Sequence, residues 1–155
     1  MAIVIAYNIS TIVICEIKIM DSEIYDKVKE LALEIANAFA AEDHRSRWAH
    51  YQKLLSVCIE YEGGEKDHPF QWGALADFTN DPLKAIELYS KAYELAKSKE
   101  LKEYAASISL AIAERYKKLG DLARAKEYGY MANEWAKSLS DLDLRQEISE
   151  FLLDV

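Results

Sequence analysis

The feature that most constrains the fold of this chain is a pattern of small residues that occurs twice, forty residues apart. The first copy has Ala85 and Ala92, and the second has Ala125 and Ala132 at the same spacing. Residues seven apart lie on one face of a helix. Where two helices cross closely, only Gly or Ala leaves room for the opposing backbone. The pattern therefore predicts two helices with these alanines buried at crossings, within a stack of helix pairs.

Both copies also carry the signals that start a helix. Asp81 is a good N-cap residue, and Pro82 follows at the first helical position, where its missing N–H costs nothing. In the second copy Gly120 stands where a helix end favours a left-handed residue, and Asp121 can cap the next helix. Each copy is therefore expected to contain the end of one helix, a turn and the start of the next helix.

Together these residues resemble the tetratricopeptide repeat, in its longer-helix form. That pattern begins with a bulky residue, then Gly or Ala, and then an aromatic residue or Leu three positions later. It continues with Ala, an aromatic residue four positions later and Ala three positions after that. The matching residues are Trp72, Gly73, Ala76, Ala85, Tyr89 and Ala92, and then Ile112, Ala113, Tyr116, Ala125, Gly129 and Ala132. The resemblance covers about residues 66–139, and Gly129 departs from it because the family has an aromatic residue there.

The resemblance implies an all-α fold of antiparallel helix pairs, stacked as a short right-handed superhelix with a capping C-terminal helix. We expect one helical domain over residues 21–155, with about seven helices. Apolar periodicity and breaker residues place them at 22–41, 43–62, 68–79, 82–98, 101–119, 122–138 and 141–153. The periodicity also predicts the core faces of the first two helices. These are Ile24, Val28, Leu31, Ile35 and Phe39 in the first, and Trp48, Tyr51, Leu55, Cys58 and Ile59 in the second.

Residues 1–20 form an atypical N-terminal segment, because seven isoleucines precede Met20. Polar residues interrupt this segment too often for a membrane span, and it lacks the basic start of a secretory signal. Two interpretations stay open: a short strand pair, or a translated leader ahead of a helix capped by Ser22. We expect residues 1–19 to be dispensable for the helical fold.

Composition excludes several classes of function. The net charge of −8 and the pI of about 4.9 disfavour a nucleic-acid partner. Cys15 and Cys58 form no CxxC motif, which suits a reduced cytoplasmic setting rather than a zinc site or disulfide framework. The chain has no HExxH, no GxSxG and no Gly-rich phosphate loop, so we expect no metal, no cofactor and no catalysis.

The resemblance also implies where a partner would bind, because the first helix of each pair lines a concave groove in that family. The corresponding positions here are Asp67, Phe70, Ala74 and Asp77, and then Ser107, Leu110, Glu114 and Lys117. The family's chaperone-binding members hold a C-terminal carboxylate with Lys and Asn at such places. Here those places are Phe70, Ala74, Leu110 and Glu114, so the clamp is missing. The last helix adds Glu147 and Glu150, which are either a solvated outer face or, with the groove acids, a negative field for a basic partner.

The sequence therefore predicts a non-enzymatic module that binds a peptide or protein, with no nucleic-acid or membrane partner. A dedicated cytoplasmic partner of another protein, such as a secretion chaperone or a toxin-neutralising immunity protein, is one hypothesis. A peptide-binding regulatory sensor is the alternative, followed by a small helical enzyme.

Overall fold

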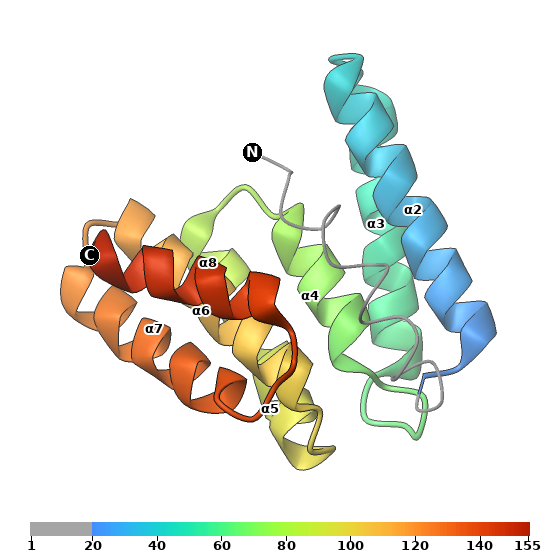
Figure 1. Cartoon of the computed structure of the whole chain (residues 1–155). Coiled ribbons are helices and arrows are strands. Elements are labelled where there is room, and N and C mark those ends of the chain that lie inside the picture. Colours follow the sequence, from blue (N-terminus) through green and yellow to red (C-terminus); the bar gives the residue numbers. More distant parts are fainter. Residues whose placement is uncertain (1–19) are drawn as a thin grey trace. The chain divides into compact units, whose positions relative to one another are not determined.

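The computed structural model describes residues 20–155, and the predictions made for residues 1–19 lie outside this range. The described residues form seven helices and no strand (Figure 1). Their bounds are α2 Ser22–Ala40, α3 His44–Tyr61, α4 Pro69–Asp77, α5 Pro82–Ser98, α6 Lys102–Lys118, α7 Leu122–Ala136 and α8 Leu142–Leu153. The all-α prediction is confirmed, and each expected helix is present with ends shifted by only a few residues.

The helices belong to two compact units, whose described residues are 20–78 and 79–155. The N-terminal unit contains α2, α3 and α4, and the C-terminal unit contains α5 to α8. Within each unit, helices that follow one another along the chain pack together. The superhelical arrangement of all the helices, and a single domain over residues 21–155, stay predictions.

Aspartates start most of the helices, as the sequence indicates. The carboxylate of Asp81 accepts hydrogen bonds from the backbone N–H groups of Leu83 and Lys84, at 2.9 and 3.3 Å. These contacts satisfy N–H groups that have no partner within the helix. The predicted cap Ser22 is wrong by one residue. Asp21 occupies the cap position instead, and its carboxylate accepts from the N–H groups of Glu23 and Ile24.

The core of the N-terminal unit differs from the predicted stripes at several positions of its first hairpin. Helix α2 buries the expected Ile24, Val28, Leu31 and Ile35, but Phe39 is 52% exposed. Helix α3 buries Leu54, Val57 and Cys58, whereas Trp48 and Ile59 are more than half exposed and Tyr51 and Leu55 are half-buried.

The loop before α4 is organised by a buried carboxylate. Asp67 is 3% exposed and accepts hydrogen bonds from Trp72 Nε1 at 2.7 Å, Gln71 Nε2 at 3.2 Å and the backbone N–H of Gly63 at 2.8 Å. Gly63 has a φ of 72°, a left-handed conformation that glycine adopts without a Cβ penalty. One side chain therefore ties the start of the α3–α4 loop to the first turn of α4.

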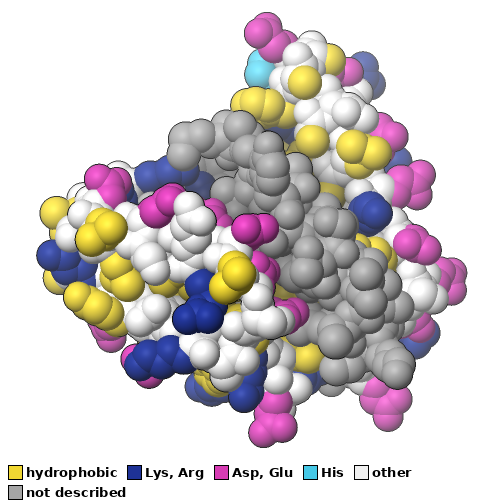
Figure 2. All heavy atoms as spheres, in the orientation of Figure 1, with side chains coloured by type: hydrophobic (Ala, Val, Ile, Leu, Met, Phe, Trp, Pro, Cys, Tyr) yellow, Lys and Arg dark blue, Asp and Glu magenta, His cyan; other side chains and the backbone are white. Residues whose placement is uncertain are grey.

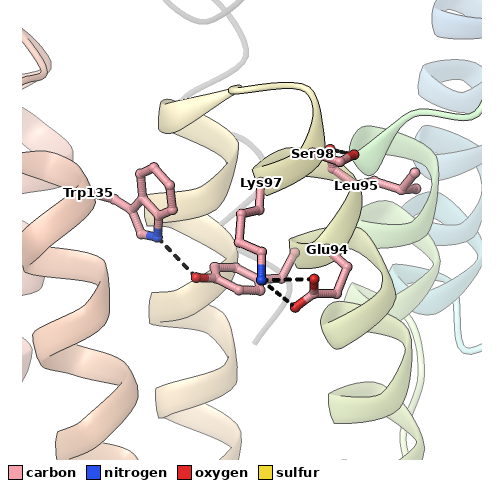
Figure 3. A network of polar contacts seen from close by, with 6 residues as sticks. Glu94, Leu95, Lys97, Ser98 and Trp135 are labelled. Atoms are coloured by element: carbon pink, nitrogen blue, oxygen red, sulfur yellow. Dashed lines mark hydrogen bonds and ion pairs between the residues drawn. The ribbon is translucent and has the colours of Figure 1, made fainter.

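The C-terminal unit confirms the burial predicted from the repeated small residues. Ala85, Ala92, Ala125 and Ala132 are each 0% exposed, in a unit where α5 packs on α6 and α6 packs on α7. Helices α5 and α7 are also joined directly, because Trp135 Nε1 donates a hydrogen bond to the Tyr93 hydroxyl at 3.2 Å (Figure 3).

Gly129 shows why the second copy of the pattern lacks its aromatic residue. A Cβ at this position would lie 2.8 Å from Leu152 Cδ2 and 3.1 Å from Phe151 Cε1. Both of these side chains belong to α8, which packs against α7. The equivalent Tyr89 is 3% exposed, and its ring lies 5.9 Å from the guanidinium carbon of Arg115 on α6. The space that an aromatic ring fills in the first copy is thus taken in the second by α8.

Candidate functional site

The four predicted groove residues of the N-terminal unit differ in their accessibility. Asp67 and Ala74 are buried, and the Asp67 carboxylate is fully engaged inside the loop. Phe70 is half-buried, with its ring stacked on Tyr25 at a centroid distance of 5.0 Å. Asp77 is half-buried at the last turn of α4. Two of the four residues therefore belong to the interior, and Phe70 and Asp77 keep partial access to solvent.

The predicted residues of the C-terminal unit follow one face of α6. Ser107, Glu114 and Lys117 are half-buried, and Leu110 is 3% exposed. The Ser107 hydroxyl donates to the backbone carbonyl of Tyr104 at 3.2 Å. Glu103 begins the same face one turn earlier, since positions i, i+4, i+7, i+11 and i+14 of a helix lie on one side. Sequence reasoning did not select Glu103, although this spacing could have found it.

Acidic groups of α6 interact electrostatically with acidic groups of α8. We call the set of Glu103 and Glu114 on α6, Asp141 at the N-cap of α8 and Glu147 in the middle of α8 the acid line. Glu103 interacts with the charge of Asp141, and Glu114 interacts with that of Glu147. Glu150, one turn beyond Glu147, is exposed and accepts a hydrogen bond from Gln146 Nε2 at 2.8 Å. The structure thus brings the predicted Glu114 and Glu147 together and adds Glu103 and Asp141.

The electrostatics of the acid line disfavour its ionised form. Burial raises the pKa of Glu114 above its ordinary value, and the Glu147 carboxylate raises it further. Burial also raises the pKa of Glu147, with further contributions from Asp141 and Glu150. The pKa of Glu103 is raised by burial and then by Asp141. Among the residues that the structure describes, no cation forms an ion pair with Glu103, Glu114 or Glu147.

Lys117, the cationic member of the predicted set, is engaged at the other end of α8. Its ammonium group forms an ion pair with Asp154 and lies 5.5 Å from the centre of the Phe151 ring. Both contacts hold the last turn of α8 against α6. Lys117 also lowers the pKa of Glu114, but by less than Lys118 and Arg115 do. Burial and Glu147 each raise that pKa by more than Lys117 lowers it. The positive charge of Lys117 therefore stabilises the docking of α8, and it forms no ion pair with the acid line.

His68 and Cys58 are of residue types that can carry catalysis, and both make structural contacts. His68 caps α4, since its Nδ1 accepts from the backbone N–H of Phe70 at 3.1 Å. The Cys58 thiol is buried and donates to the carbonyl of Gln71 at 3.3 Å. No group of three or more His, Cys, Asp or Glu residues within 20–155 is arranged to hold a metal ion.

No protein-family model, no curated protein and no solved structure matches this chain. In the described range no helix is both long and apolar enough to cross a membrane. The resemblance to the tetratricopeptide repeat rests on the sequence pattern, and the partner-binding role of the ten predicted residues stays a prediction.

Proposed function

We propose that this protein is a non-enzymatic interaction module whose C-terminal unit binds a basic segment of a partner protein along the acid line. One observation carries the proposal: three half-buried carboxylates of α6 and α8, Glu103, Glu114 and Glu147, interact with like charges, and no cation within residues 20–155 forms an ion pair with them. Lysine or arginine side chains of a partner would remove this repulsion. The binding energy would then include relief of a cost that the free protein carries.

The overall charge favours the same class of partner. A chain of net charge −8 attracts basic proteins and repels acidic ones and nucleic acid. A dedicated cytoplasmic partner of another protein, either a secretion chaperone or an immunity protein, fits a small acidic helical module. A regulatory sensor that binds a basic peptide is the second candidate, and the acid line supports it equally well.

A synthetic oligolysine peptide is a suitable first probe of the acid line. We expect binding by isothermal titration calorimetry that weakens as salt is raised from about 50 to 500 mM, because the screening length shortens severalfold over this range. The double variant Glu114→Gln/Glu147→Gln should bind more weakly and lose most of its salt dependence. Loss of affinity is the expected result because both charges of the central pair are removed.

The matched control removes two charges from the same unit away from the acid line. Glu87 and Glu127 are exposed residues of α5 and α7, so Glu87→Gln/Glu127→Gln gives the same net charge. Equal weakening by both double variants would show that the peptide senses only net charge, which contradicts a site on α6 and α8. A pull-down from native extract, repeated with both variants, then tests the same distinction on natural partners.

A further inference from the structure

His68 holds the start of α4 from a buried position. It is 2% exposed, and its Nδ1 accepts a hydrogen bond from the backbone N–H of Phe70 at 3.1 Å. Pro69, the first residue of α4, has no N–H, so the N–H of Phe70 is the first that the helix offers. An imidazole nitrogen accepts a hydrogen bond only while it carries no proton. The cap of α4 therefore requires a neutral His68 ring with its proton on Nε2.

The first turn of α4 is also the place where this helix meets α2 and α3. The ring of Phe70 stacks on that of Tyr25 of α2 at a centroid distance of 5.0 Å. The backbone carbonyl of Gln71 accepts a hydrogen bond from the Cys58 thiol of α3 at 3.3 Å. Cys58 is 0% exposed, and the residue that accepts its hydrogen bond comes shortly after His68 in the chain. A change in the position of this turn would therefore uncover the Cys58 thiol.

Protonation of His68 removes this cap. The new N–H on Nδ1 would face the N–H of Phe70, so a hydrogen bond becomes a contact between two donors. The ring would also carry a positive charge at a residue that is only 2% exposed, which is unfavourable for an ion. Both effects favour a form in which the ring has turned into water and the first turn of α4 is open.

The ionisable groups around the start of α4 are engaged in contacts of their own. Tyr25 and Cys58 make the contacts to α4 described above, and Lys66 of the loop pairs with Asp21 at 2.8 Å. The acidic and basic residues of α2 and α3 are exposed, apart from a half-buried arginine in α3. Within the described part of the N-terminal unit, Asp67 is the only buried carboxylate, and it already accepts three hydrogen bonds. A protonated His68 ring could bond to it only by displacing one of these donors.

From this cap and its burial, we infer that His68 is an acid-sensitive latch on the first turn of α4. Above about pH 6.5 an imidazole in water is neutral, so the latch is closed and its opening does not depend on pH. Below about pH 6.5 opening takes up one proton, so the ratio of open to closed molecules rises about tenfold for each pH unit. The latch lies in the N-terminal unit and the acid line in the C-terminal unit, so its test involves no basic partner.

Protection of the Cys58 thiol against a dithiodipyridine reagent, which reacts with thiols in mild acid, tests the latch. The full chain carries Cys15→Ser, so that Cys58 is the single thiol. The reaction rate in concentrated urea, divided by the rate of the folded chain at the same pH, gives a protection factor. This ratio cancels the pH dependence of thiol reactivity itself. Protection should stay constant from about pH 8 to 7 and fall about thirtyfold by about pH 5, because opening takes up one proton.

His68→Asn should make protection independent of pH, because the Asn side-chain oxygen is a good cap acceptor that takes up no proton in this range. A purely structural role for His68 would instead lower protection equally at every pH. His44→Gln and His50→Gln are the matched controls, since each removes one histidine from α3. His44 is exposed and His50 is half-buried, and a histidine side chain is visible at the surface of the hairpin end in Figure 2. Both controls should keep the full loss of protection.

Protection that does not change between about pH 8 and 5 would overturn the inference. So would an equal loss in His68→Asn, or a loss that His44→Gln or His50→Gln abolishes. If His68→Asn does not fold, nuclear magnetic resonance of the natural chain decides, since the two control variants assign the third histidine by elimination. The ring protons of His68 should not titrate while α4 is closed. A titration near pH 6.5 with the N–H of Phe70 still protected from exchange contradicts the latch.

Discussion

Substituting alanine for two helical glycines, Gly73 and Gly129, should change stability in opposite directions. Both lie inside helices, α4 and α7, where replacing Gly by Ala ordinarily stabilises by about 0.5–1 kcal/mol. A Cβ at Gly73 meets no heavy atom within 4 Å, whereas a Cβ at Gly129 lies 2.8 Å from Leu152 Cδ2. The difference between the two sites is therefore the packing of α8 on α7.

The magnitudes follow from these contacts. For Gly73→Ala we expect the full helix gain of about 0.5–1 kcal/mol. For Gly129→Ala, overpacking costs about 1–3 kcal/mol and is partly offset by the same gain, which leaves a net loss of about 1 kcal/mol. Leu152 can give way at the end of its side chain, but Phe151 is also close, at 3.1 Å.

Urea unfolding followed by circular dichroism and tryptophan fluorescence measures both effects. Trp48 and Trp72 lie in the N-terminal unit and Trp135 in the C-terminal unit, so the summed fluorescence follows the unfolding of both units. The midpoint should rise for Gly73→Ala and fall for Gly129→Ala at unchanged m-value. Adding Leu152→Ala should recover part of the loss at Gly129, since it removes the atom in contact. If Gly129→Ala proves as stable as the natural chain, α8 does not pack on α7 as described.

Three further predictions concern the interior and the acid line. Ala92→Leu should overpack the buried face of α5 and lower the free energy of unfolding by about 1–3 kcal/mol, and an unchanged thermal melt would contradict the helix crossing. Asp67→Asn should lower the free energy of unfolding by about 1–3 kcal/mol. One of the two oxygens that accept hydrogen bonds is replaced by an NH2 group, which then faces an N–H donor without an acceptor. Urea unfolding monitored by tryptophan fluorescence measures this loss. Because the raised pKa values of Glu114 and Glu147 mean that the folded state binds protons more tightly than the unfolded state, their ionisation destabilises the fold at neutral pH. The free energy of unfolding should therefore rise as pH falls from 7 through the raised pKa values towards the ordinary value of 4.5. The double variant Glu114→Gln/Glu147→Gln should be more stable at pH 7 and should show a flatter rise. A steeper rise in the variant would refute the assignment.

The acid dependence below that range has the opposite sign. Lys66 lowers the pKa of the Asp21 carboxyl, helped by the N–H of Ile24 at the start of α2. The N–H and guanidinium groups of Arg124 likewise lower the pKa of Asp121. Stability from these caps is present above their ordinary value of 3.8 and is lost as pH falls through the lowered values. Maximal stability is therefore expected in mildly acidic solution.

The sequence by itself determined where the helices lie and which small residues they bury. Asp81 and Pro82 fix a helix start through contacts within a single turn, and the alanines of α5 and α7 are confined to crossings because no larger side chain fits there. Such signals are local, so they are readable without knowing the neighbours. Even the error at Ser22 was one residue, because Asp21 beside it has the same capping chemistry.

Tertiary structure alone decided which apolar and charged residues have neighbours. Phe39, Trp48 and Ile59 follow helical periodicity as well as any core residue, yet all three are more than half exposed. Gly129 departs from the repeat because α8 returns to that spot, and Glu114 meets Glu147 for the same reason. Periodicity states which side of a helix is apolar, but the length and path of the next helix determine how much of that side is covered.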